Sequence, residues 1–571
     1  MKPLISFRHV VLWSFALCVW GVLATPAAAQ YFGQNKVQYR QLDFKVLHTE
    51  HFDIYFYPEE QAGTDIAARM AERWYARLSK LFRHELRGRQ PLILYASPTD
   101  FQQTNVIPGD LGEGTGGVTE PVRRRIVLPL AGPLGDTDHV LGHELVHAFQ
   151  FDITTTPGAA PGENGAERLP LWFIEGMAEY LSLGPVDSNT AMWMRDAARQ
   201  EKLPSIKDLD DPKYFPYRWG QAFWAYFGGK YGDDLIPVML STAAVANDMD
   251  TVTKKIVGVD TKQMSEEWHA AIHQTYDRIL ASTTPPAGSG RAVITANDEA
   301  SQLNVGPAIS PDGRWIAFLS SRGLLSIDLY VADAMSGKIV RKLTSTATDP
   351  HVSSIEFIYS AGSWDRESKR LAIATIASGR PALAIYDAID GGKEREIKIP
   401  EVDQILNPSW APDGHAIAFT GLTQGLSDLF VYDLRASRLQ RLTNDAYAEV
   451  HPSWSPDSRL IAFATDRFTT NLDTLALGHY ELATLDPANS RVQRVQTFAD
   501  ADSRNPQWSG DGRQLYFIAD PGGIANVYAV TIANGSVAQL TNVQTGASGI
   551  TSSSPALSVA ASACSSGAPA A

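Results

Sequence analysis

A motif of about a dozen residues recurs five times in the C-terminal half of the chain. Its clearest copies read NPSWAPDGHAIAF from Asn407 and HPSWSPDSRLIAF from His451; related copies begin at Asn304 and Asn505, and a weaker one at Ser363. Corresponding positions lie 44 to 55 residues apart, a period typical of β-propeller blades. In most copies an Asp-Gly-type turn joins two strands, because glycine tolerates the positive φ of a tight hairpin. The repeat therefore predicts a propeller, whose units stack because none can bury both of its faces alone.

The recurring SPDG-x-x-I-A-F pattern resembles the WD40-like repeats of the TolB propeller family over roughly residues 291–560. A further copy starts at Ser554 but runs into a low-complexity tail. The resemblance thus implies an all-β propeller of about six blades, the last one incomplete. Two explanations of the count stay open: residues 293–300 help to close the ring, or the chain is a truncated version of something longer.

The N-terminal half contains the pentapeptide His-Glu-Leu-Val-His, which includes His143, Glu144 and His147. Asp136 or Asp138 can cap a helix that begins just before it. Residues four apart share one face of a helix, so the two histidines can direct their imidazoles at one metal ion. Zinc suits such ligands and keeps one position open in catalytic sites. The motif predicts one zinc ion per chain, with Glu144 as the general base.

A second motif, PLWFIEGMAEY, starts at Pro170. In a helix, its Glu175 and Glu179 lie four apart on one face. Two histidines and one glutamate complete a His/His/Glu zinc site. The remaining carboxylate can accept a hydrogen bond from a ligand histidine and so fix its tautomer.

Together the two motifs resemble those of the gluzincin metallopeptidases, including the "peptidase MA-like" group, over roughly residues 40–280. The resemblance implies that Glu175 is the third zinc ligand and that Glu179, one turn later, supports a ligand histidine. The stretch between His147 and Glu175 is longer than in the best-known members, and the extra residues read as a loop. Two alternatives stay open: Glu179 is the ligand instead, or both glutamates are solvated helix charges.

These patterns predict a multidomain chain. The expected segments are a signal peptide (1–29), an α+β gluzincin-like metallopeptidase domain (30–280), a Ser/Thr/Pro/Gly-rich linker (281–291), a TolB-like β-propeller (292–560) and a disordered tail (561–571). In the first domain we expect a strand at residues 126–130, just ahead of the zinc-binding helix. Pro129 suits an edge strand, and extended peptides can pair with such an edge.

Four further residues carry weaker hypotheses. Tyr217 can donate a hydrogen bond to a tetrahedral oxyanion, a role that a downstream tyrosine fills in gluzincins, or it is a packing aromatic; Arg218 has the same two interpretations. Glu120 can anchor the amino terminus of a substrate or be a loop carboxylate. We interpret His139 as a surface histidine in the first turn of the helix.

The N-terminus has the order of a secretory signal peptide: Lys2 and Arg8, then an apolar run at 10–23, then the small residues 27–29. The run is short for a membrane span, although an uncleaved anchor stays open. We expect an exported protein, periplasmic or extracellular, with no transmembrane segment after signal removal. Removal also leaves one of the two cysteines, which excludes an internal disulfide.

The charge pattern argues against two classes of partner. The net charge is −14, and the only basic block is Arg123–Arg125, so neither nucleic acid nor an anionic membrane surface is an expected partner. The sequence therefore predicts an exported zinc metallopeptidase acting on peptide or protein substrates, with a propeller that gates substrate or binds a protein partner. The alternative functions are an envelope TolB-like binding or scaffold protein with an inactive peptidase-like domain, and a zinc hydrolase acting on a non-peptide bond.

Overall fold

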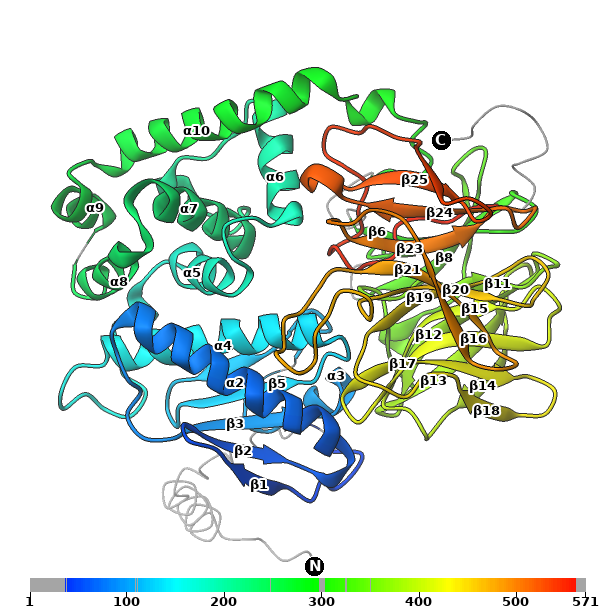
Figure 1. Ribbon diagram of the computed structural model, residues 1–571, viewed down its shortest axis with the longest axis horizontal. Coiled ribbons are helices and arrows are strands. Elements are labelled where there is room, and N and C mark those ends of the chain that lie inside the picture. The colour runs from blue at the N-terminus through cyan, green and yellow to red at the C-terminus, as the bar shows by residue number, and fades with distance from the viewer. Residues whose placement is uncertain are drawn as a thin grey trace, which may run out of the picture.

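The computed structural model describes residues 36 and 38–560, apart from 108, 110, 247, 297–302, 324, 325 and 350. The predicted signal peptide, the tail and both cysteines lie outside the described residues. A mixed helical and β N-terminal half stands beside a β-propeller (Figure 1). None of the described helices combines the length and apolar composition that crossing a membrane requires.

The sheet of the N-terminal half has the strand order β1-β2-β3-β5-β4. Its strands are β1 (Lys45–His48), β2 (Phe52–Phe56), β3 (Gln90–Tyr95), β4 (Val118–Glu120) and β5 (Arg125–Pro129). β2, β3 and β5 run parallel, whereas β4 pairs with β5 in antiparallel fashion. The predicted strand at 126–130 exists as β5, but the prediction that it is an edge was wrong because the three-residue β4 lies outside it. Pro129 pairs with Tyr95 at the end of β5, beyond the reach of β4.

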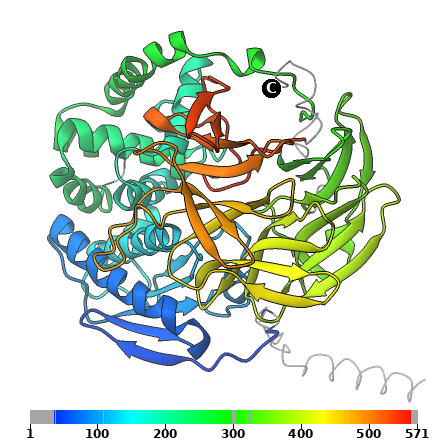
Figure 2. The same cartoon turned by 45° about the vertical axis from the view of Figure 1, so that its right-hand side comes forward.

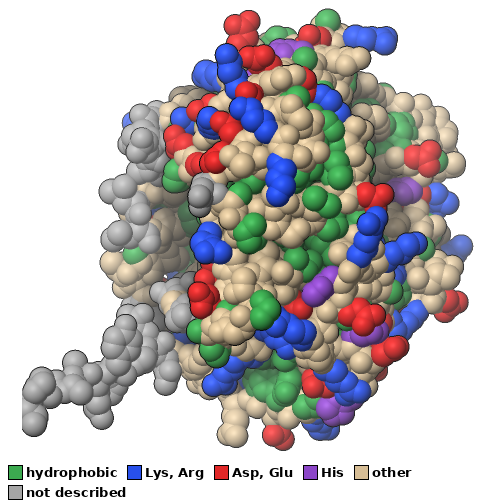
Figure 3. Space-filling view, turned by 90° about the vertical axis from the view of Figure 1, so that its left-hand side faces the viewer, with side chains coloured by type: hydrophobic (Ala, Val, Ile, Leu, Met, Phe, Trp, Pro, Cys, Tyr) green, Lys and Arg blue, Asp and Glu red, His purple; other side chains and the backbone are tan. Residues whose placement is uncertain are grey.

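Helices cover this sheet and build the larger part of the N-terminal half (Figure 1). They are α2 (Gln61–Phe82), α3 (Pro98–Phe101), α4 (Leu134–Thr154), α5 (Leu171–Leu183), α6 (Ser188–Arg199), α7 (Pro216–Tyr231), α8 (Ile236–Ala243), α9 (Met249–Val257) and α10 (Thr261–Ser282). One continuous core joins α2, α4, α5 and α7 to the sheet, with Trp172, Trp224 and Trp268 among its fully buried side chains. On the face turned to the viewer in Figure 3, basic and acidic side chains are interspersed.

Within the described residues, the C-terminal half forms a propeller of five blades, which are arranged around a common axis (Figure 2). The strands of blade 1 are β6 (Asn304–Ile309), β7 (Trp315–Ser320), β8 (Asp328–Asp333) and β9 (Ile339–Lys342). Blade 2 has β10 (Val352–Ile355), β11 (Ser363–Trp364), β12 (Arg370–Ala377), β13 (Arg380–Asp387) and β14 (Lys393–Lys398). Blade 3 has β15 (Gln404–Trp410), β16 (Ala416–Thr423), β17 (Leu426–Asp433) and β18 (Arg438–Arg441). Blade 4 has β19 (Glu449–Trp454), β20 (Ile461–Thr465), β21 (Glu481–Asp486) and β22 (Arg491–Val495), and blade 5 has β23 (Ser503–Trp508), β24 (Gln514–Ala519), β25 (Asn526–Thr531) and β26 (Ser536–Gln539).

The prediction of about six blades was wrong, because the last repeat copy forms no blade within the described residues. Instead, its segment bridges the first and last blades. The amide of Ile309 in β6 donates to Ser558 Oγ at 3.0 Å. The amides of Ala556 and Leu557 donate to Asn505 Oδ1 in β23 at 2.9 and 2.7 Å. The stretch at 293–296 lies beside blade 1, where the Thr295 carbonyl accepts a hydrogen bond from Arg322; residues 297–300 lie outside the described residues.

Candidate metal centre

Helix α4 carries His143 and His147, both of which are buried. The helix is seated tightly on α2: an added Cβ at Gly142 would come within 2.6 Å of the Trp74 ring. Asp138 accepts hydrogen bonds from Trp74 Nε1 and Arg73 at 2.9 and 2.6 Å. The expectation that Asp136 or Asp138 caps α4 was therefore wrong, since Pro133 occupies the N-cap position.

Helix α5 brings Glu175 and Glu179 over α4 because it crosses α7 at very short range. An added Cβ at Gly176 would lie 2.3 Å from the Cα of Gly220, and one at Gly220 would lie 2.1 Å from the Trp172 carbonyl oxygen. Only glycine lets two helices approach so closely. The crossing also places Tyr217, in the first turn of α7, beside the same site.

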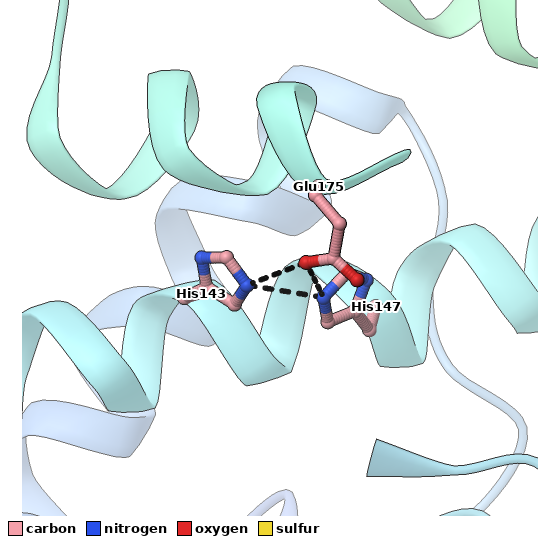
Figure 4. Close-up of side chains that lie close together, drawn as sticks. All are labelled: His143, His147 and Glu175. Atoms are coloured by element: carbon pink, nitrogen blue, oxygen red, sulfur yellow. Dashed lines mark hydrogen bonds and ion pairs between the residues drawn. The ribbon is translucent and has the colours of Figure 1, made fainter. Parts of the chain in front are cut away.

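The side chains of His143, His147 and Glu175 meet at one point (Figure 4). His143 Nε2 and His147 Nε2 are 3.1 Å apart, and Glu175 Oε2 lies 3.2 and 3.3 Å from them. Two ligands bound to zinc at about 2.0–2.1 Å with a tetrahedral angle between them are about 3.3 Å apart. The three donor atoms therefore have the spacing, as well as the chemistry, that a zinc ion requires.

The outer nitrogens of both histidines face acceptors, which leaves both Nε2 atoms pointing inward. His147 Nδ1 lies 2.8 Å from Gln150 Oε1, and Gln150 is held in turn by the Ile174 carbonyl at 3.0 Å. His143 Nδ1 lies 3.1 Å from Glu179 Oε1. Such contacts fix the tautomer and the orientation of metal-binding imidazoles. Sequence reasoning missed Gln150, although its position three residues after His147 on one helix face is a usable signal.

Glu179 is shared by several neighbouring basic side chains. His139 Nε2 lies 3.3 Å from Glu179 Oε1, and Arg218 Nη1 lies 3.2 Å from Oε2 and 3.4 Å from Asp187. His139 is partly exposed, as expected of a surface histidine, but it lies in the second turn of α4 rather than the first and contacts Glu179. Arg218, one of the weaker candidates, is likewise committed to these carboxylates.

Glu144 is buried and held by the edge strand. Thr119 Oγ1 in β4 lies 2.7 Å from Glu144 Oε2 and 2.8 Å from the Glu144 carbonyl oxygen. Gly117 lies so close that an added Cβ would come within 2.8 Å of Glu144 Cγ. Both residues escaped sequence reasoning because their contacts with Glu144 cross 25 residues or more and leave no local pattern.

Two other candidates occupy different surroundings. The ring of Tyr217 stacks on that of His143, with centroids 5.8 Å apart and an interplanar angle of 20°. Glu120, proposed as an anchor for a substrate amino terminus, is paired with Arg125 Nε at 2.6 Å and accepts from the Arg123 amide.

The histidines and glutamates of the site shift the pKa values of one another. Burial alone would lower the pKa of His143, but hydrogen bonds with Glu175 and Glu179 outweigh burial and raise the pKa to about 10. Burial would raise the pKa of Glu175, but the two histidines hold it well below its usual range. Burial and the charge of Glu175 raise the pKa of Tyr217, so its hydroxyl keeps its proton at neutral pH. The ionised Glu175 carboxylate thus favours positive charge at the point where the histidines meet.

Comparison with known proteins bears on the propeller. The family described as the TolB beta propeller domain (PD40) matches residues 352–471. This part of the chain is similar to that domain. A curated relative, dipeptidyl-peptidase 5 of Porphyromonas gingivalis, is 25% identical over 251 residues, which cover 41% of this chain and 33% of the relative. The chain thus spans about a third of the length of that relative.

Solved structures similar to the chain include two TolB proteins. A putative TolB from Agrobacterium tumefaciens is 20% identical, with a TM-score of 0.35 and coverage of 44% of this chain and 87% of that chain. TolB from Acinetobacter baumannii is 20% identical, with a TM-score of 0.32 and coverage of 50% and 64%. A protein named as a peptidase is thus among the distant relatives of the chain.

Proposed function

We propose that the protein is a zinc-dependent metallopeptidase of the gluzincin type. The observation that carries the proposal is the convergence of His143, His147 and Glu175 within 4.8 Å of one another. The imidazole contacts with Gln150 and Glu179 support it, because a metal site needs its ligands oriented as well as gathered. The buried Glu144, next to a candidate ligand, supplies the general base that hydrolysis requires.

Zinc bound at this site would supply a Lewis acid that polarises a peptide carbonyl and lowers the pKa of a water molecule. Glu144 takes the proton of the attacking water and passes it to the leaving amine. Thr119 holds Glu144 in place for both transfers. Tyr217, which keeps its proton, donates a hydrogen bond to the oxyanion that forms from the carbonyl.

The other parts of the proposal rest on the sequence. Export to the periplasm or beyond follows from the predicted signal peptide. The propeller serves to admit substrate or to bind a protein partner, and it contacts the N-terminal half. The Arg195 guanidinium, for example, donates to the Gln544 carbonyl at 2.9 Å.

The proposal is tested by digesting a peptide library with wild-type protein and with Glu144→Gln, and reading the products by mass spectrometry. We expect cleavage by the wild type and a loss of about 10²- to 10⁴-fold in the variant, the usual contribution of a general base. The variant should bind as much zinc as the wild type, because Glu144 is not a ligand. A wild-type protein that binds zinc but cleaves no peptide would favour a non-peptide substrate. One that neither binds zinc nor cleaves would favour the binding-protein alternative.

A further inference from the structure

The segment from Leu111 to Thr119, called here the 111–119 loop, connects the propeller to the candidate base. At its propeller end, Glu113 Oε1 accepts hydrogen bonds from the amides of Phe357 and Ile358 in blade 2, at 2.8 and 2.9 Å. Gly114 leaves room for Ile358, whose Cδ1 would be 3.4 Å from an added Cβ. Leu111 packs on the cluster around Tyr57 and Phe101.

The other end of the loop lies against α4. An added Cβ would lie 3.1 Å from Val140 at Gly116 and 2.8 Å from Glu144 at Gly117. Thr119 then contacts the Glu144 carboxylate. Three residues, Gly114 to Gly116, therefore separate Glu113, whose side chain binds the propeller, from Gly117, whose backbone packs on the base. The loop thus contacts the propeller through Glu113 and contacts Glu144 through Gly117.

Glu113 also faces a second buried carboxyl. Glu356 of blade 2 is buried, and its Oε1 accepts from Gln404 Nε2 of blade 3 at 3.0 Å. The Oε2 atoms of Glu113 and Glu356 are shielded from solvent and have no hydrogen-bond partner among the described residues. A proton held between the two carboxyls satisfies both oxygens and removes the repulsion between two buried charges.

We propose that the 111–119 loop couples propeller docking to the position of Glu144, with Glu113 as the positioning residue and the Glu113–Glu356 pair as a proton-dependent latch. The inference rests on the proposed function in one respect, the role of Glu144 as the base. Glu113 touches neither the candidate metal ligands nor a reacting atom, so it acts through the loop.

The pair responds to pH in a defined direction. Burial and the charge of Glu356 raise the pKa of Glu113, and burial raises that of Glu356. Because the pKa of each carboxyl is raised in the contact between the 111–119 loop and blade 2, protonation stabilises this contact at low pH. The contribution is lost as pH rises through the raised pKa values. Tyr359 of blade 2 also lies near the pair, since the charges of both carboxyls raise its pKa. The latch therefore opens above neutral pH, when both carboxyls ionise.

The test uses the full-length protein and the variants Glu113→Ala and Glu113→Gln. Glu167→Ala, at an exposed glutamate in the same half of the molecule, is the matched control. The measurements are zinc content, kcat and KM on a short peptide from neutral to alkaline pH, and hydrogen exchange of residues 111–120. We expect Glu113→Ala to lower kcat by about 10- to 100-fold, as a displacement of about 1 Å does, with KM and zinc content unchanged and faster exchange of the loop.

Glu113→Gln keeps the acceptor oxygen and replaces the ionisable oxygen by an amide that donates to Glu356. It should retain the neutral-pH kcat and lose the alkaline decline in kcat and in loop protection that the wild type shows. The inference would be overturned if Glu113→Ala kept the kcat of the wild type, or if it lost zinc together with kcat. An unchanged alkaline decline in kcat in Glu113→Gln would overturn it as well. A wild-type protein without any hydrolysis would overturn the proposed function and, with it, the role given to Glu144.

Discussion

The crossing of α5 and α7 is the part of the site most sensitive to a single added methyl group. In Gly176→Ala, the new Cβ would start 2.3 Å from the backbone of Gly220. Carbon atoms pack at about 3.5–4.0 Å, so the helices must separate by about 1.2–1.7 Å. Neither side can yield by rotating a side chain, because both contacts are backbone.

This separation should be visible in both stability and rate. Overpacking of this kind costs about 1–3 kcal/mol, which lowers Tm by roughly 2–12 °C in a domain of 150–250 residues. Glu175 precedes Gly176 directly and Tyr217 lies one turn before Gly220, so the shift also moves a candidate ligand and a candidate donor. A displacement of about 1 Å lowers kcat about 100-fold.

The assay compares calorimetric Tm and peptide hydrolysis in wild type, Gly176→Ala and Gly229→Ala. Gly229 lies in the same α7, and an added Cβ there meets nothing within 4 Å. The control should keep the wild-type rate and gain about 0.5–1 kcal/mol from the higher helix propensity of alanine. Unchanged Tm and rate in Gly176→Ala would refute the claim that this close crossing builds the site.

Two further predictions concern the candidate oxyanion donor and the closure of the propeller. Tyr217→Phe should keep its zinc and its Tm but lose about 10²- to 10³-fold in kcat, the usual cost of removing one oxyanion donor; equal kcat in the two proteins would leave Tyr217 as a packing aromatic. His451 contacts the Ser553 carbonyl of the ring-closing segment at 2.9 Å, and burial lowers the pKa of His451 to about 4. Because an unfolded histidine titrates at about 6.5, the unfolded chain binds this proton first, and stability should fall as pH drops from about 6.5 towards 4. In His451→Gln, the free energy of unfolding, measured by urea titration, should depend less on pH in this range. An identical pH dependence in both proteins would contradict the prediction.

Local patterns in the sequence were sufficient to predict those features of the site and the propeller that depend on residues close together in the chain. The spacing of His143 and His147 on one helix, and of Glu175 and Glu179 on the next, was sufficient to expect that these side chains face one site. The propeller prediction was confirmed because its repeat is long and recurs, with each Asp-Gly-type turn marking a hairpin.

Features that depend on distant contacts were missed or predicted wrongly. β4 has three residues, too few for an alternating pattern, so the edge was assigned to β5. The sixth repeat copy lacks strands of its own because its Ser558 and Leu557 bind neighbouring blades instead. The contact between Glu113 and blade 2 spans 244 residues, and nothing near Glu113 in the sequence marks it.

The central claim is that His143, His147 and Glu175 bind one zinc ion. Elemental analysis of wild type and Glu175→Ala, purified in parallel with the control Glu167→Ala, tests this claim most directly. We predict about one zinc per chain in the wild type and the control, and a marked loss in Glu175→Ala. A wild-type protein without zinc even after supplementation, or a Glu175→Ala variant that retains it fully, would contradict the account.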